Sequence, residues 1–393
     1  MEIDFDHVIN RQESDSDKWH QYGEDVLPLW VADMDFPSPE PVLRALHQRI
    51  EHGVFGYPEA ISIRSKNTRA LVEAIIERMW ERYHWEIQPE DLVFLPGIVM
   101  AFNLACHALA VPNGGVLVQT PVYPPFLSAP GNAGLNRQEI GLTYNNDGRY
   151  ILDLDAFEKA FTPETCLFLL CNPHNPVGRV FRQNELLKMA EICLQKGVAI
   201  CSDEIHCDLV YSDHQHIPIA SLDPEIARHT ITLMAPSKTF NLAGLQCSFA
   251  IIPNPILRRK FQQSKKGLVG WVNLMGYTAA LAAYREGGEW LEQLMVYLED
   301  NRNYLYEYVK QELPKVRIAL PEATYLGWLD CSEAIQSNPY EFFLHKAKVA
   351  LSDGKIFGHG GEGFVRLNFG CPRSILRQAL ERMKDALTRE IET

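Results

Sequence analysis

Residues 231–244 read ITLMAPSKTFNLAG, a short apolar run followed at once by a polar turn that carries Lys238. Two other apolar runs end in the same way: residues 166–178 read CLFLLCNPHNPVG, and residues 198–206 read VAICSDEIH. From about residue 91, such runs alternate with helical stretches, which predicts βαβ units and a parallel sheet. Ligands bind beyond the carboxyl ends of parallel strands, so we expect the polar residues after these three runs to meet at one site.

The spacing of apolar residues predicts the remaining elements. Strands are expected at 92–95, 116–119, 166–171, 198–201, 231–234 and 248–252, and helices at 40–52, 68–83, 100–109 and 289–312. The pattern then changes, and strands at 324–329 and 364–369 with a closing helix at 376–391 indicate a smaller α+β domain. We therefore expect a large domain at 46–288 and a small domain that combines an N-terminal arm, 1–45, with residues 289–393.

Composition argues against several classes of partner and site. A net charge of −13 argues against nucleic acid or an anionic membrane as the main partner. The chain contains no uncharged apolar stretch of about 18 residues, so no membrane-spanning helix is expected. The acidic start, MEIDFD, lacks the features of a signal peptide, and we expect a cytoplasmic protein. Nine cysteines without a C-x-x-C pair indicate reduced thiols and no metal site.

Lys238 is the first candidate for catalysis. Burial at the end of a strand lowers the pKa of an amine and makes it nucleophilic. An isolated lysine at such a position is more often a surface residue, but here Ser237, Asn241 and Gly244 supply a hydroxyl and close-approach positions for a phosphate. This context favours a lysine that binds a cofactor aldehyde and then moves the proton at the substrate Cα.

Asp203 and Asn175 follow the other two apolar runs. A buried carboxylate at Asp203 would pair with a protonated pyridine nitrogen, and the alternative is a helix N-cap. Asn175, between two prolines, could donate to a phenolate oxygen, although asparagine is also frequent in turns of this kind. His206 could orient Asp203 by a hydrogen bond or have a purely structural role. An amine, an amide and a carboxylate at one site suit pyridoxal phosphate.

Three further positions extend the expected site. Gly97, Ile98 and Val99 link a strand to a helix, and the amide N–H groups of a helix N-terminus bind phosphate. Tyr123 follows another strand and could stack on a pyridine ring, although a lone tyrosine usually belongs to the core. Arg366 lies in an apolar strand and could bind a substrate carboxylate with its planar fork, the alternative being a structural ion pair.

Four motifs carry a resemblance to a known family: WVADMDF at 30–36, GVFGY at 53–57, SDEIH at 202–206 and SKTFN at 237–241. With the residues above, nearly the whole chain resembles the class I/II aminotransferase superfamily of pyridoxal-phosphate enzymes, which have fold type I. Within it the chain looks like the C–S lyase branch, which includes cystathionine β-lyases related to a maltose-regulon modulator. The resemblance implies an α/β fold in which helices sandwich a mostly parallel seven-stranded sheet, next to a smaller α+β domain.

The resemblance also implies roles for the cofactor contacts. Lys238 corresponds to the Schiff-base lysine, Asn175 and Asp203 to contacts of the cofactor ring, and Tyr123 to the stacking side chain. Tyr57 is implied to reach the phosphate held by the neighbouring subunit, which makes the expected assembly a homodimer with composite sites.

On the substrate side, the resemblance implies that Arg366 holds the α-carboxylate, with Ala32 and Asn175 beside it. The implied reaction is β-elimination from cystathionine or a related cysteine S-conjugate to pyruvate, ammonia and a thiol. Gln246 stands where many aminotransferases have a phosphate-binding arginine, which fits the lyase branch better. An aminotransferase and a regulatory protein that binds a transcription factor are the alternatives. Residues 59–66 depart from the family pattern near the expected entrance, so the sequence leaves the natural thioether open.

Overall fold

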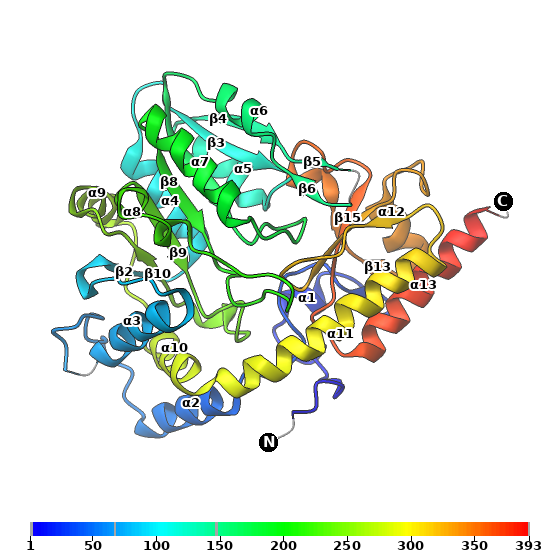
Figure 1. Cartoon of the computed structure of the whole chain (residues 1–393). Coiled ribbons are helices and arrows are strands. Elements are labelled where there is room, and N and C mark those ends of the chain that lie inside the picture. The colour runs from blue at the N-terminus through cyan, green and yellow to red at the C-terminus, as the bar shows by residue number, and fades with distance from the viewer. Residues whose placement is uncertain (1–2, 67, 146–147, 392–393) are drawn as a thin grey trace.

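The computed structural model describes residues 3–66, 68–145 and 148–391. The central sheet contains β2 (Leu92–Leu95), β3 (Gly115–Thr120), β4 (Asn136–Gly141), β7 (Thr165–Cys171), β8 (Ala199–Asp203), β9 (Thr230–Met234) and β10 (Ser248–Ile251). These strands lie in the order β2, β10, β9, β8, β7, β3, β4 (Figure 1). Within this sheet β10 runs antiparallel to both neighbours and the other pairings are parallel, so the mostly parallel seven-stranded sheet is confirmed.

Within the central sheet, the predicted strands and the observed strands differ by one element. All six strands expected from apolar runs are present within two residues of the predicted bounds, and β4 was missed. Its sequence, NRQEIG, is polar because β4 is the edge strand, pairs only with β3 and is largely exposed. An edge strand of this kind carries no apolar signal.

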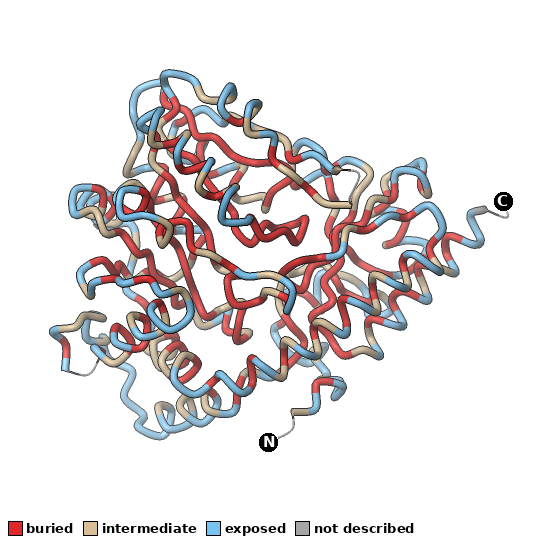
Figure 2. Tube along the Cα trace, in the orientation of Figure 1, coloured by how far each residue is buried: buried red, intermediate tan, exposed pale blue. Residues whose placement is uncertain are grey.

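Helices cover both faces of the sheet. The helices that the structure describes across the chain are α1 (Asp17–His20), α2 (Glu40–His52), α3 (Arg69–Tyr83), α4 (Ile98–Leu109), α5 (Pro124–Asn132), α6 (Leu154–Lys159), α7 (Gln183–Lys196), α8 (Pro224–Arg228), α9 (Pro255–Lys265), α10 (Leu274–Glu286), α11 (Gly288–Glu312), α12 (Pro339–Phe342) and α13 (Arg373–Ile391), and α11, α12 and α13 pack outside the central sheet. Leu167 and Leu169 of β7 pack with α4, α5 and α9, whereas Phe168 and Leu170 pack with α6 and α7. The buried strands therefore run between two helical layers (Figure 2).

The helix ends follow local sequence signals. The helix expected at 40–52 is α2, and Gly53 ends it with a left-handed φ of 71°, which favours glycine. The helices expected at 68–83, 100–109 and 289–312 are also present, with α4 beginning two residues earlier than predicted. Before α2, the N-terminal arm is irregular apart from the single turn of α1 and the short strand β1 (Leu27–Pro28).

A second, four-stranded sheet brings the C-terminal part of the chain to the site. It is antiparallel in the order β11 (Arg317–Ile318), β12 (Leu326–Asp330), β15 (Phe364–Asn368), β14 (Ser352–Asp353). The long helix α11 and the closing helix α13 lie side by side in the same apolar cluster (Figure 1). Small strand pairs join β1 (Leu27–Pro28) to β13 (Val349–Ala350) and β5 (Thr143–Tyr144) to β6 (Tyr150–Ile151).

The β1–β13 pair joins the N-terminal segment to the C-terminal part of the chain. The helix α2 spans the expected boundary at residues 45 and 46 and packs on α10. Within the described ranges, no helix is long and apolar enough to cross a membrane. All nine cysteines are unpaired.

Candidate active site

A cavity of about 700 Å³ lies where β7, β8 and β9 end. It is lined by eleven of the twelve site residues predicted from the sequence: Ala32, Gly97, Ile98, Val99, Tyr123, Asn175, Asp203, His206, Ser237, Lys238 and Arg366. The three strand ends therefore converge, and β15 and the irregular segment 30–36 complete the wall from the other side.

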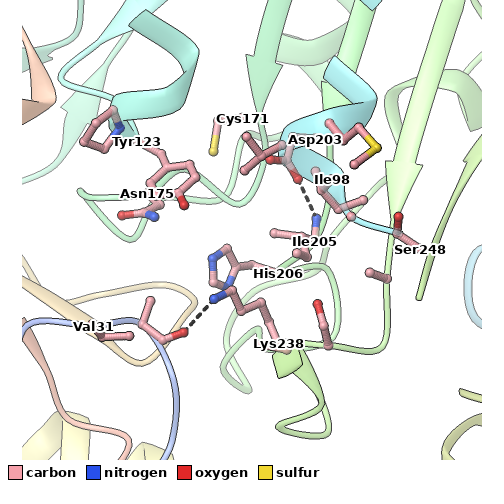
Figure 3. Close-up of a pocket in the computed structure, with 18 of the residues that line it drawn as sticks. Val31, Ile98, Tyr123, Cys171, Asn175, Asp203, Ile205, His206, Lys238 and Ser248 are labelled. Atoms are coloured by element: carbon pink, nitrogen blue, oxygen red, sulfur yellow. Dashed lines mark hydrogen bonds between the residues drawn. The ribbon is translucent and has the colours of Figure 1, made fainter. Parts of the chain in front are cut away.

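Lys238 stands in the turn after β9 with its amine in the cavity (Figure 3). Nζ donates a hydrogen bond to the Ala32 carbonyl at 2.6 Å. Burial and, to a lesser extent, the positive charge of Arg366 lower the pKa of Lys238 to about 8, against the opposing carboxylates of Asp33 and Asp203. About a tenth of the amine is therefore neutral and nucleophilic at pH 7, far more than for an ordinary lysine.

Asp203 is the last residue of β8, which sets its carboxylate at the cavity wall (Figure 3). Oδ1 accepts a hydrogen bond from the Ile205 N–H at 3.1 Å. Burial and, to a lesser extent, the neighbouring Glu204 raise the pKa of Asp203 to about 7, against the opposing effects of the Ile205 N–H and Lys238. The carboxylate is held in position without a strong cationic partner, so it can form an ion pair with a cation that enters the cavity.

Arg366 comes from β15 and is buried. Nη1 donates to Asn175 Oδ1 at 3.0 Å, and Nη2 donates to the Trp30 carbonyl at 2.9 Å and to Ser352 Oγ at 3.2 Å. Nε is buried without a partner, and among the described residues no carboxylate forms an ion pair with this guanidinium. Burial lowers the pKa of Arg366 to about 10. Within the described residues Arg366 therefore forms no structural ion pair, and its guanidinium has free donors that could bind an anion.

The Arg366 contact also orients Asn175. Its Oδ1 faces the guanidinium, so its Nδ2 group is left to donate elsewhere. Asn175 is tied to the next wall residue as well, because the Tyr123 N–H donates to the Asn175 carbonyl at 3.0 Å. Figure 3 shows Tyr123 and Asn175 together on one side of the cavity and Asp203 on another.

The N-terminus of α4 opens into the same cavity. Gly97 is its N-cap, with no side-chain cap, so the first N–H groups of the helix have no intrahelical partner. A Cβ at Gly97 would project into open space with no atom within 4 Å. Ser237 and Gln246 line the same cavity and add a hydroxyl and an amide.

His206 differs from one expectation. It is buried on the cavity wall, but neither it nor Asp203 contributes a hydrogen bond to the other, and its Nδ1 has no partner within the described part of the chain. The expected orienting bond is therefore wrong: the Asp203 oxygen is taken by a backbone N–H instead. The His206 ring lies beside Lys238 (Figure 3), and burial together with the charges of Lys238 and Arg366 lowers its pKa to about 3.

Tyr57 lies away from the cavity. Its side chain is 98% exposed, and its ring contacts Trp271 with the centroids 6.5 Å apart. Residues 59–66 follow it and lie outside the cavity wall as well.

Sequence reasoning missed several wall residues. Trp30, Ile205, Ser352 and Phe357 line the cavity beside the predicted residues. Ile205 could have been found, because it lies between Asp203 and His206 in the chain. Ser352 and Phe357 carry no local signal, since strand β14 and the short 3-10 helix after it, Gly354–Phe357, bring them to the site.

Comparisons with known proteins identify similar sequences and similar solved structures. A family model for aminotransferase class I and II matches residues 24–383. Cystathionine beta-lyase PatB of Bacillus subtilis (strain 168) is 42% identical, over 98% of this chain and 100% of the relative. The crystal structure of OvoB is 45% identical with a TM-score of 0.93, covering 98% of this chain and 99% of that one. The structure of cystalysin from Treponema denticola, which contains pyridoxal 5'-phosphate, is 34% identical with a TM-score of 0.94, covering 99% and 100%. The chain therefore belongs to the class I and II aminotransferase family.

Proposed function

We propose that this chain is a pyridoxal-phosphate-dependent C–S β-lyase that cleaves cystathionine or related cysteine S-conjugates to pyruvate, ammonia and a thiol. One observation carries the proposal: within the described residues, two cations without ion-pair partners, the partly buried Lys238 and the buried Arg366, face the same cavity as the buried carboxylate of Asp203. The full-length relative named as a cystathionine beta-lyase supports the reaction class.

The cavity fits pyridoxal phosphate by its donor set. Asp203 would hold the ring nitrogen, the free Nδ2 of Asn175 would donate to the phenolic oxygen, and Tyr123 would cover a ring face. The unpaired N–H groups at the start of α4 and the Ser237 hydroxyl would hold the phosphate. The open space over Gly97 leaves room for that phosphate.

When bound, pyridoxal phosphate supplies an aldehyde that reacts with amines and a ring that withdraws electrons from the substrate Cα. Asp203 keeps a proton on the ring nitrogen, because an anion close to that nitrogen favours its protonated form. Arg366 binds the substrate α-carboxylate with the donors that the protein leaves unused. The substrate is thereby oriented with its Cα toward Lys238.

Lys238 is the base. Its neutral amine removes the Cα proton, and the electron pair left on Cα forms a double bond to Cβ. The Cβ–S bond breaks as this bond forms, and sulfur leaves with its electron pair as a thiolate. The 2-aminoacrylate product takes up water and releases pyruvate and ammonia.

Gln246 favours elimination over transamination. It lines the cavity at the position that the family resemblance gives to an arginine in many aminotransferases. A transaminase must also return a proton to the cofactor carbon and keep the Cβ substituent, and no residue on the cavity wall argues specifically for that route.

We also infer a homodimer in which Tyr57 reaches the partner's phosphate. In support, the exposed rings of Tyr57 and Trp271 are in contact, and the residues Val54, Phe55 and Leu268, close to them in sequence, are exposed as well. Exposed apolar side chains of this kind are typical of an interface, and a second copy of the chain would cover them. A cytoplasmic location and a domain boundary at 288 and 289 stay predictions from the sequence.

A product assay tests the proposed reaction. The holoenzyme is incubated with cystathionine, cystine and S-methyl-L-cysteine in turn, and pyruvate and free thiol are measured. Elimination releases pyruvate and a thiol in equal amounts from the two thioethers, and pyruvate with a persulfide from cystine, whereas transamination gives a keto acid that retains its sulfur. Absence of pyruvate with all three substrates would contradict the proposal.

A further inference from the structure

The segment 30–36 lies outside any helix or strand, and its first three residues, Trp30, Val31 and Ala32, form part of the cavity wall. Side chains from distant elements hold its carbonyl groups: Arg366 donates to Trp30, Asn368 to Val31 and Asp33, Lys238 and Tyr325 to Ala32, and Asn241 to Met34 and Phe36. The position of Ala32, and hence of the acceptor for the Lys238 amine, depends on side chains rather than on backbone pairing.

The N-terminal arm supplies the remaining support. The amine of Lys18 is fully buried and contacts Asp35 at 2.7 Å and Asp33 at 3.5 Å. Arg11 contacts the same two carboxylates at 2.6 and 2.9 Å, and the Trp19 indole N–H donates to Asp35 at 3.0 Å. Burial disfavours the charge on Asp35, but Lys18, Trp19 and Arg11 hold its pKa below the ordinary value.

The arm also contacts a wall residue directly. The Trp30 indole N–H donates to the Lys18 carbonyl at 3.2 Å, and the Tyr22 ring meets Trp30 edge to face at 6.0 Å. The main-chain carbonyl of Lys18 therefore contacts Trp30. Its amine contacts Asp33, the residue that follows Ala32. Asp33 is also one of the groups that raise the pKa of Lys238.

We propose that Lys18, assisted by Arg11, is a positioning residue that fixes Trp30 and Ala32 at the carboxylate end of the substrate cavity. This inference rests on the proposed function, because it concerns where an amino-acid substrate binds. Lys18 does not line the cavity, so it acts only through the residues it holds. Loss of its charge would release Asp33 and Asp35 and let the segment 30–36 shift against Arg366.

The test uses holoenzyme and L-alanine, an amino acid without a leaving group on Cβ, whose binding is followed by the change in cofactor absorbance. Lys18→Met keeps the length of the side chain and removes the charge. We expect its Kd for L-alanine to rise about tenfold or more, with the KM for S-methyl-L-cysteine rising equally and kcat within about threefold of wild type. Arg11→Gln leaves Lys18 on Asp35 and should raise the Kd about threefold.

Arg258→Met is the matched control. Arg258 pairs with Asp91 at 3.0 Å at the amino end of β2, away from the cavity. It should lower the melting temperature and leave the Kd for L-alanine unchanged. A merely structural role for Lys18 predicts the same result for Lys18→Met, namely a lower melting temperature with an unchanged Kd, and that result overturns the inference. If Lys18→Met does not fold, an unchanged Kd in Arg11→Gln overturns it.

The same experiment separates the two proposals. A wild-type holoenzyme that neither responds to L-alanine nor releases pyruvate overturns the proposed function and the inference together. A wild type that does both, with variants that bind L-alanine equally well, overturns only the role of Lys18.

Discussion

Replacement of Arg366 by lysine tests whether the buried guanidinium binds the substrate carboxylate. Arginine has five N–H donors, and three are used by Asn175, Trp30 and Ser352, which leaves two for a ligand. Charge-assisted bonds of this kind contribute about 2–4 kcal/mol together, or about 30- to 1,000-fold in binding. Arg366→Lys keeps a charge and loses the planar fork, so the Kd for L-alanine should rise by a factor in that range.

The substitution also removes the bonds to Asn175 and Trp30, and some stability will be lost with them. A comparison of two ligands avoids this complication. L-Alaninamide has the same amine and Cα as L-alanine but no carboxylate, so its binding should change by less than about threefold in the variant. Both constants are measured on the same preparation by cofactor absorbance.

The decisive quantity is therefore the ratio of the Kd for L-alaninamide to the Kd for L-alanine. It should be large in the wild type and should fall in Arg366→Lys by the factor lost for L-alanine. If the variant weakens the acid and the amide equally, Arg366 acts through the shape of the cavity and the assignment of the carboxylate is refuted.

Three further predictions follow from the same residues. Borohydride reduction of the holoenzyme should attach the cofactor to Lys238, as peptide mapping would show, and label on another lysine would contradict the assignment. Because the Lys238 amine must be neutral to take a proton and its pKa is lowered to about 8, kcat should rise with pH and level off above that value; a profile that falls over this range would count against this base. Mixing inactive Tyr57→Phe subunits with inactive Lys238→Ala subunits should restore about one site in two per hybrid dimer, and hybrids that stay inactive would place Tyr57 outside the partner's site.

Much of the site could be predicted because its chemically active side chains lie directly at or after the ends of strands. Lys238, Asp203 and Asn175 each follow a buried apolar run, and parallel strands bring such ends to one edge. Arg366 could be predicted for a different reason, since a charge inside an apolar strand needs a partner. Within the described residues no protein carboxylate pairs with this guanidinium, which favours a substrate carboxylate as its partner, and that role stays a prediction.

The support of the segment 30–36 could not be predicted from local patterns. Asn241, Asn368 and Lys18 are 127 or more positions apart from one another in sequence (368 − 241 = 127; 241 − 18 = 223), and each reads as an ordinary polar residue in its own neighbourhood. Only the fold brings them to one loop. The edge strand β4 was missed for the opposite reason, because its exposure removes the apolar residues by which strands are recognised.

The charge balance of the cavity is consistent with the chemistry proposed for it. The chain carries a net charge of −13, yet its buried cavity holds two cations, Lys238 and Arg366, against the single carboxylate of Asp203. Burial lowers the pKa of both cations and raises that of the acid, so in the absence of ligands each charge is disfavoured. A phosphate, a substrate carboxylate and a protonated ring nitrogen supply the missing counter-charges. Binding of cofactor and substrate should therefore stabilise the fold itself, because these ligands compensate charges that the protein buries without partners.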